Sequence, residues 1–190
     1  MSIDTLHIKG MVCPRCIMAV ESVLSKYNIE YIKVILGEIH LVNPVDEEQE
    51  KKLEAELVTL GFEILSSRKS QLIEKIKNAV ISMVHHQNHP EKIGRLSEQL
   101  PILLGHSYSS LSTLFSEVDG QTIEKYLILQ KIEKAKELLI YEELNISEIA
   151  YKLNYSSSQH LSRQFKDITG MTPSSFKKSK HLSRRSLNDI

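Results

Sequence analysis

The chain has 190 residues, of which 41% are hydrophobic and 25% charged, and its formal net charge is zero. These values are ordinary for a soluble globular protein of one or two domains. No apolar run approaches the roughly 20 residues of a membrane helix, and the N-terminus lacks a secretory signal, so we expect a cytoplasmic protein.

Charge is unevenly distributed along the chain. Residues 146–190 carry 8 Lys and Arg against 3 Asp and Glu, whereas residues 1–69 carry 8 against 11. The basic end is where a polyanion would bind, with a solvated basic tail as the alternative.

Residue periodicity predicts strands and helices over the first 67 residues. Alternating apolar residues predict strands, and apolar residues spaced three and four apart predict helices. The expected elements are a strand at 5–10, a helix at 13–28, two strands within 29–43 that turn near Gly37, a helix at 46–61 and a strand at 62–67. This β-α-β-β-α-β order is the ferredoxin-like arrangement.

The two cysteines of the chain, Cys13 and Cys16, lie in "GMVCPRC", between the first strand and the first helix. Two thiolates one helical turn apart can converge on a soft metal ion such as Cu(I) or Zn(II). The positive N-terminus of the helix is expected to lower both thiol pKa values.

Through Gly10, Met11, Cys13 and Cys16, residues 3–66 resemble the heavy-metal-associated domain, the small module of copper chaperones and metal-pump N-termini. The resemblance implies that the two cysteines bind metal. The Cys-Pro-x-Cys pair is also similar to thioredoxin-type redox motifs. A metal site, a redox switch and a vestigial pair in a module kept for folding or dimerisation all stay open.

The junction between the two halves opens with a polar hinge at 66–70, followed by a helix with an apolar stripe over 72–84. His85, His86 and His89 cluster at its end. Two His four residues apart could bind zinc. We favour the other interpretation, in which they are cations stabilised by the negative end of the helix dipole.

From residue 95 onward the chain shows two weakly similar halves, joined by a long amphipathic helix over 121–144. Each half reads as a short helix, a turn and a second helix. The second half contains "ISEIAYKLNYSSSQHLSRQFKDITGMTPSSFKK". On these motifs, residues 70–178 resemble the AraC/XylS-type transcription regulators. The resemblance implies an all-α domain with two helix-turn-helix units that binds DNA.

In the second unit, Ser147 is expected to cap the positioning helix, and Leu161 and Phe165 to anchor the recognition helix. The residues expected at the DNA are Ser157, Ser158, Gln159, Ser162, Arg163 and Lys166. Gln can read adenine and Arg guanine, whereas Ser and Lys suit contacts to the DNA backbone. His160 is expected either to point outward or to cover the turn, and we favour an exposed supporting role. Further phosphate attraction is expected from Lys177, Lys178, Lys180, Arg184 and Arg185.

The first unit is a weaker candidate for reading DNA. Its recognition helix, about 108–118, has no Lys or Arg, and Pro101 is expected to interrupt its positioning helix. We expect hydroxyl contacts from Ser109, Ser110 and Ser112 with little base discrimination. A purely structural helical subdomain is the alternative.

Together these patterns predict an α+β chain with a heavy-metal-associated-like ferredoxin-fold domain at 1–67, an AraC-type DNA-binding domain at 70–180 and a flexible basic tail at 181–190. The expected function is sequence-specific transcription regulation, with a soft metal ion, Cu(I) or Zn(II), as the candidate effector. Double-stranded DNA is the expected partner, with a homodimer as a further option and no membrane. No enzyme motif is present: there is no phosphate loop, and acidic pairs such as Glu47–Glu48 suit solvated helix faces. The alternative function is a metal chaperone or thiol redox carrier whose helical domain docks a protein partner.

Overall fold

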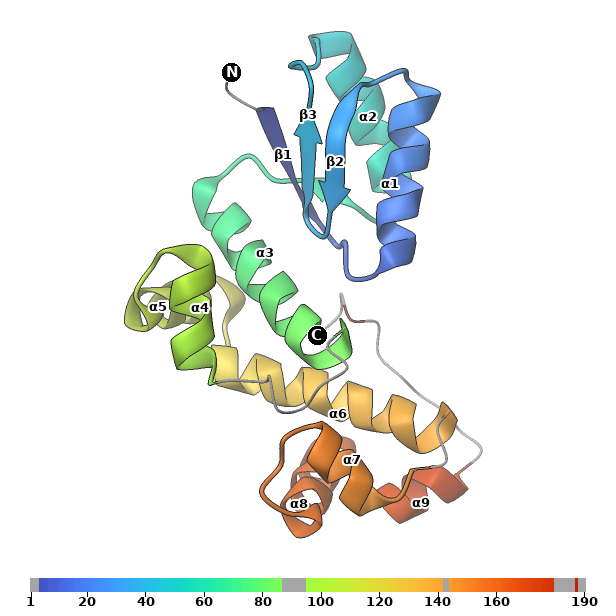
Figure 1. Ribbon diagram of the computed structural model, residues 1–190, viewed down its shortest axis with the longest axis vertical. Helices are drawn as coiled ribbons and strands as arrows, with labels where there is room; N and C mark the ends of the chain where they lie inside the picture. Colours follow the sequence, from blue (N-terminus) through green and yellow to red (C-terminus); the bar gives the residue numbers. More distant parts are fainter. Residues whose placement is uncertain (1–3, 87–94, 142–143, 180–186, 188–190) are drawn as a thin grey trace. The chain divides into compact units, whose positions relative to one another are not determined.

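The computed structural model describes residues 4–86, 95–141, 144–179 and 187 (Figure 1). The chain divides into two compact units, Met1–Asn78 and Ala79–Ile190. Within the described residues, none of the helices combines the length and the apolar character needed to span a lipid bilayer.

The N-terminal unit is a small antiparallel sheet with two helices on one of its faces (Figure 1). Its elements are β1 (Asp4–Lys9), α1 (Pro14–Lys26), β2 (Tyr31–Ile35), β3 (Glu38–Leu41), α2 (Glu47–Thr59) and β4 (Glu63–Ile64). The predicted order of strands and helices is therefore confirmed. The four strands lie in the order β2-β3-β1-β4, so that β1 pairs with both β3 and β4.

Local sequence explains where the two helices of this unit begin. Pro14 occupies the first turn of α1, where its missing N–H costs no hydrogen bond. The Asp46 side chain accepts from the backbone N–H of Gln49, and the Gln49 side chain accepts from the backbone N–H of Asp46, which closes a capping box at the start of α2. The core between sheet and helices includes Ile8, Leu24 and other buried aliphatic residues.

The first half of α3 (Arg68–Ile81) belongs to the N-terminal unit. Gln71 donates a hydrogen bond to the carbonyl of Leu65 at 2.8 Å, and Lys75 forms an ion pair with Glu38 of β3 at 2.9 Å. These two contacts attach the first half of the helix to the unit that precedes it. The compact units therefore divide inside α3 rather than in the predicted hinge at 66–70.

The C-terminal unit is helical, with α6 as the helix that joins two helix pairs (Figure 1). After the end of α3 come a π-helical turn η1 (Ser82–His86), α4 (Leu96–Leu104), α5 (Tyr108–Asp119), α6 (Ile123–Tyr141), α7 (Ile146–Lys152), α8 (Ser158–Thr169) and α9 (Pro173–Lys178). The predicted amphipathic helix is confirmed, since Ile132, Ala135, Leu138 and Leu139 of α6 are all buried.

The internal similarity predicted from the sequence extends to side-chain packing. In the first half, the Phe115 ring of α5 lies 5.7 Å from the Tyr126 ring of α6, measured between centroids. In the second half, the Phe165 ring of α8 lies 5.4 Å from the Phe176 ring of α9. Each pair joins the second helix of a helix-turn-helix unit to the helix that follows it, and such aromatic contacts add to the stabilisation from burial.

The prediction that Pro101 interrupts the first positioning helix is wrong. Pro101 lies inside α4, which runs on to Leu104 and ends at Gly105 in the left-handed conformation. Proline removes one backbone hydrogen bond from the helix. Burial of Leu96 and Leu100 on the preceding turns keeps the helix in place despite that loss.

Candidate nucleic-acid interface

The second helix-turn-helix unit begins with a capped helix, α7. The Asn145 side chain accepts hydrogen bonds from the backbone N–H groups of Ser147 and Glu148 at 3.0 and 3.1 Å. The Glu148 carboxylate accepts from the backbone N–H of Asn145 at 2.7 Å. The cap is therefore Asn145, not the predicted Ser147. The pattern Asn-x-x-Glu before an apolar helix was the sequence signal for it.

The turn after α7 places Asn154 at φ +54°, in the left-handed region. Asparagine tolerates this conformation better than most residues, so the turn forms without a glycine at this position. Ile149, Ala150 and Leu153, which precede the turn, are buried.

The recognition helix α8 is anchored on one side and exposed on the other. The Ser157 hydroxyl caps it by accepting a hydrogen bond from the backbone N–H of His160 at 3.1 Å. Leu161 and Phe165 are fully buried. The other predicted DNA-contacting residues divide into exposed Gln159, Arg163 and Lys166, and half-buried Ser158 and Ser162.

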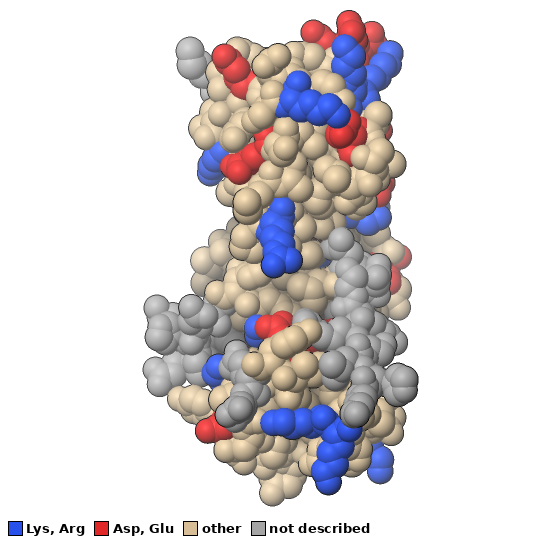
Figure 2. Space-filling view, turned by 90° about the vertical axis from the view of Figure 1, so that its right-hand side faces the viewer, with Lys and Arg blue, Asp and Glu red and all other residues tan. Residues whose placement is uncertain are grey.

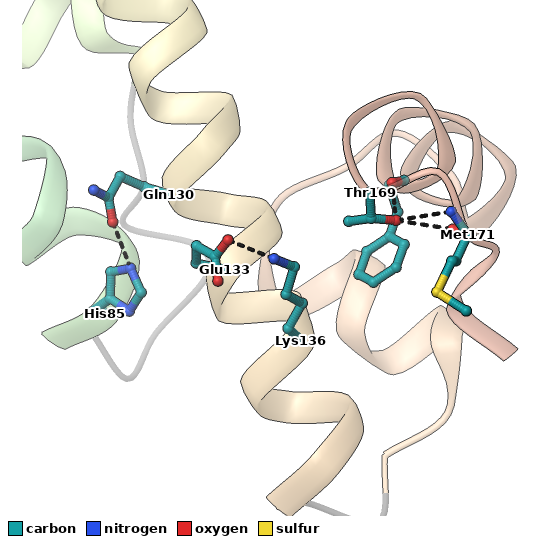
Figure 3. A network of polar contacts seen from close by, with 7 residues as sticks. His85, Gln130, Glu133, Lys136, Thr169 and Met171 are labelled. Atoms are coloured by element: carbon teal, nitrogen blue, oxygen red, sulfur yellow. Dashed lines mark hydrogen bonds and ion pairs between the residues drawn. The ribbon is translucent and has the colours of Figure 1, made fainter. Parts of the chain in front are cut away.

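The end of α8 is fixed by a polar turn (Figure 3). Gly170 has φ +76° and donates its N–H to the carbonyl of Lys166. The Thr169 hydroxyl donates to the carbonyl of Phe165 at 2.7 Å and accepts from the N–H of Met171 at 3.2 Å. Lys166 therefore lies in the last turn of a helix with a defined end.

Tyr155 in the turn holds α8 by several contacts. Its hydroxyl donates a hydrogen bond to Gln164 of α8 at 2.6 Å, and burial raises its pKa. The ammonium group of Lys131 on α6 lies 5.2 Å from the centre of the Tyr155 ring. Burial lowers the pKa of Lys131. These contacts were not predictable from the sequence, because they join residues that share no motif and depend on how the helices pack.

His160 covers the turn rather than projecting into solvent. Its ring meets the Tyr155 ring edge-on at 5.3 Å between centroids, and its Nδ1 lies 3.1 Å from the Ser156 hydroxyl. The ring is half-buried. The predicted exposed role is therefore wrong, because the His160 ring contacts Tyr155 and Ser156 of the turn.

The first unit has the same frame without the basic side chains. Ser107 caps α5 by accepting from the N–H of Ser110, and Gly120 ends it in the left-handed conformation. Ser109 and Ser110 are exposed, and Ser112 is half-buried. At the positions that correspond to Arg163 and Lys166, α5 carries Thr113, which is exposed, and Ser116, which is half-buried.

Basic side chains extend beyond α8. Lys177 and Lys178 are exposed on α9, whereas Lys180, Arg184 and Arg185 lie outside the described residues. On the face shown in Figure 2, acidic side chains gather mainly over the N-terminal unit, and the far end of the C-terminal unit shows mainly basic ones. This distribution matches the uneven charge of the sequence.

Polar groups are paired inside the C-terminal unit (Figure 3). His85 of η1 donates from Nε2 to Gln130 of α6 at 2.9 Å, and Gln130 donates to the Tyr126 hydroxyl at 3.0 Å. One turn further along α6, the buried side chains of Glu133 and Lys136 form an ion pair at 2.6 Å. Buried polar groups of this kind are retained only when they have partners.

The prediction that the histidines after α3 are cations at the end of the helix dipole is wrong for His85. Burial lowers the pKa of His85 to about 4, so the ring is neutral at pH 7 and is not a cation at the end of the helix dipole. His86 is exposed, and His89 lies outside the described residues. The prediction missed the Gln130 contact, which needs two helices to meet in space.

The two cysteines lie together at the start of α1, with 3.4 Å between their sulfur atoms. Burial raises the pKa of the Cys13 thiol, but hydrogen bonds from the backbone and thiol of Cys16 outweigh this effect and bring the pKa below its ordinary value. Burial raises the pKa of the Cys16 thiol. The prediction that both pKa values are lowered is therefore wrong for Cys16. Across the described part of the chain, no cluster of three or more His, Cys, Asp or Glu could hold a metal ion.

Comparison with known proteins bears on the helical unit. A family model described as a helix-turn-helix domain matches residues 103–179. The chain is 36% identical over 100 residues to the xylose operon regulatory protein of Escherichia coli strain K12. These 100 residues cover 52% of the chain and 25% of that protein. Residues 103–179 are thus similar to a helix-turn-helix domain.

A second relative and a solved structure agree with this assignment. The F1 operon positive regulatory protein of Yersinia pestis is 36% identical over 78 residues, which cover 41% of the chain and 26% of that protein. The C-terminal domain of AraT, a response regulator from Geobacillus stearothermophilus, is 26% identical with a TM-score of 0.51, over 62% of the chain and 92% of that domain. The chain thus spans about a quarter of the length of the two operon regulators.

Proposed function

We propose that the chain is a sequence-specific DNA-binding transcription regulator in which α8 of the AraC-type domain reads bases in the major groove. The observation that carries this proposal is the exposure of Gln159, Arg163 and Lys166 on a helix whose opposite side is anchored by buried Leu161 and Phe165. The spacing of four and three residues places the three polar side chains on one helix face. A helix of this kind fits the major groove of B-DNA.

The exposed side chains suit different parts of a duplex. Arg163 can form two hydrogen bonds with guanine, and Gln159 can form two with adenine. Lys166 and the hydroxyls of Ser157, Ser158 and Ser162 suit phosphates, which position the protein without reading sequence. In the first unit, Ser109, Ser110 and Ser112 offer hydroxyl contacts only. We infer that base discrimination comes mainly from the second unit.

The matched positions of the two units provide the test. Selection from a random duplex pool, followed by gel shifts, should yield a preferred site. Arg163→Ala should weaken binding to that site by about 1–3 kcal/mol, or about 5- to 150-fold, and relax the preference at one base pair. Thr113→Ala, the matched change in α5, should leave affinity and preference nearly unchanged. Failure to select any sequence would reject the proposal and favour the alternative of a carrier whose helical unit docks a protein.

The proposed effector site is the cysteine pair of the N-terminal unit, which we propose to be a ferredoxin-like, heavy-metal-associated-like domain on its element order and cysteine loop. Structural zinc sites nearly always have four ligands, and the described residues offer a cluster of only two here. Soft thiolates select Cu(I), so the pair suits Cu(I) better than Zn(II). Cys13 and Cys16 would hold the ion, which would draw both sulfur atoms to one centre.

Metal analysis of protein purified under reducing conditions tests this part separately. We expect one Cu(I) per chain, lost in the Cys13→Ser/Cys16→Ser double variant, while the gel shift with the selected duplex persists in both proteins. Equal copper content in the two proteins would reject Cys13 and Cys16 as the ligands. Sedimentation with and without the duplex would test the further proposal that two chains bind as a homodimer.

A further inference from the structure

The thiols of Cys13 and Cys16 are placed to react with each other. Their sulfur atoms lie 3.4 Å apart at the start of α1. A disulfide needs about 2.0 Å between the sulfur atoms. The approach required is therefore on the order of one ångström, within reach of side-chain rotation and a small shift of the helix start.

The surroundings of the two thiols differ. Cys16 packs against the apolar core of the N-terminal unit, and its sulfur lies 4.0 Å from the carbonyl oxygen of Gly10. Cys13 is the residue before the first turn of α1, and its side chain makes no cap hydrogen bond. Both thiols are half-buried, but Cys16 is the one packed against the apolar core, so Cys13 is the thiol that a molecule from solvent can reach first.

The loop that carries the thiols is attached to α3. The backbone N–H of Gly10 donates a hydrogen bond to the carboxylate of buried Glu74 on α3 at 3.1 Å. Gly10 has φ +94°, a conformation that few other residues adopt. One residue thus has its N–H bound to α3 and its carbonyl oxygen beside Cys16. A shift of Cys16 toward Cys13 changes the surroundings of that carbonyl.

We propose that Cys13 and Cys16 form a reversible dithiol–disulfide switch that exchanges with small disulfides, and that the Gly10–Glu74 hydrogen bond passes its state to the first half of α3. The inference does not depend on the proposed function, because the thiols can exchange whether or not the chain binds DNA.

The exchange is balanced in atoms and electrons. The Cys13 thiolate attacks one sulfur of a small disulfide, which forms a mixed disulfide and releases one thiolate. The Cys16 thiol gives its proton to solvent, and its sulfur attacks the Cys13 sulfur and expels the second thiolate. The two released thiolates take up protons, so that the protein loses two electrons and two protons, one of them released when Cys13 forms its thiolate, while the small disulfide is reduced to two thiols.

Glutathione buffers test the chemistry in the full chain, with a metal chelator present so that bound copper plays no part. Because the chain has only two cysteines, alkylation and mass measurement report both thiols directly. As the share of oxidised glutathione rises, the wild type should change from two alkylated thiols to none. Cys16→Ser should accumulate one glutathione on Cys13, and Cys13→Ser should accumulate far less. Two thiols that stay alkylatable in excess oxidised glutathione, or equal adducts on the two variants, would overturn the switch.

Hydrogen exchange tests the link to α3. Oxidation of the wild type should speed amide exchange in peptides from residues 68–78 and leave those from α2 unchanged, since α2 has no contact with Gly10 among the described hydrogen bonds. Glu74→Ala removes the acceptor and should abolish the difference between the two redox states in α3. Glu74→Gln keeps the size of the side chain and an amide oxygen as acceptor, so it should retain part of the difference between the two redox states. This variant controls for a folding defect in Glu74→Ala. Identical exchange of α3 in the oxidised and reduced wild type would overturn the link.

Discussion

His85 Nε2 lies 2.9 Å from Gln130 Oε1, and this hydrogen bond joins the π-helical turn η1 to the middle of α6. An amide oxygen can only accept, so His85 carries its proton on Nε2 and is the donor. Gln130 is fully buried, and its amide nitrogen donates onward to the Tyr126 hydroxyl. The pair therefore requires a proton on Nε2, and because burial lowers the pKa of His85 to about 4, at neutral pH this is the neutral tautomer protonated on Nε2.

The first prediction concerns acid stability. Burial lowers the pKa of His85 from 6.5 to about 4. Between these values the unfolded chain binds the proton and the folded chain does not. The contribution of His85 to the free energy of unfolding is therefore complete above pH 6.5, falls as the pH decreases and levels off below about pH 4. From this group alone, we expect the free energy of unfolding to be about 2 kcal/mol lower at pH 5 than at pH 7. Urea unfolding followed by circular dichroism at several pH values measures this.

The control is His85→Gln, which offers an amide in place of the imidazole and does not titrate. Its free energy of unfolding should change less with pH than that of the wild type, so that the difference between the two proteins narrows from pH 7 to pH 5. Parallel pH curves for the two proteins would contradict the prediction.

The second prediction compares the observed cap of α7 with the predicted one. Asn145→Ala removes a side chain that accepts two backbone hydrogen bonds and should cost about 1 kcal/mol. Ser147 lies in the first turn of the helix and is exposed, so Ser147→Ala should change stability by less than about 0.5 kcal/mol. Urea midpoints at one pH measure both. A larger loss for Ser147→Ala would contradict the assignment of the cap.

Local pattern was enough to predict most of the elements, and contacts between distant segments were not predictable from it. The periodicity of apolar residues indicated α6 and its buried side, because burial of one helix face repeats along the sequence. The local cost of proline predicts a break at Pro101, but the burial of Leu96 and Leu100 keeps α4 continuous.

In the candidate site, too, local features were predictable from the sequence and contacts between distant residues were not. The exposed face of α8 follows from spacing, once Leu161 and Phe165 are taken as anchors. The contact of Tyr155 with Lys131 and the contact of Glu74 with Gly10 each join residues more than twenty positions apart. Residue type and spacing carry no information on such pairs, since they depend on how helices pack.

The third prediction concerns the turn before α8. Asn154 has φ +54°, which an alanine adopts at a cost of roughly 1–2 kcal/mol. Asn154→Gly should therefore be more stable than Asn154→Ala by about 1 kcal/mol, because glycine adopts this conformation freely. Urea unfolding of the two variants under the same conditions measures the difference. Equal stability would mean that the turn relaxes to a negative φ at this residue.

The fourth prediction separates phosphate attraction from base reading in α8. Lys166 is exposed in the last turn of the helix and suits a phosphate. Lys166→Ala should weaken binding to selected and unrelated duplexes by a similar factor, and it should reduce the slope of log affinity against log salt by about 1. Fluorescence anisotropy titrations across a range of salt concentrations measure both quantities.

Ser116 of α5 provides the matched control for that change, because it holds the corresponding position in the first unit and carries no charge. Ser116→Ala should leave the salt slope unchanged, whereas Arg163→Ala should weaken the selected duplex more than an unrelated one. If Lys166→Ala instead lowers affinity for the selected duplex alone and leaves the salt slope unchanged, Lys166 contacts a base edge. That outcome would contradict its proposed role as a phosphate contact. A salt slope that falls equally in the Ser116 and Lys166 variants would show that neither side chain neutralises a phosphate.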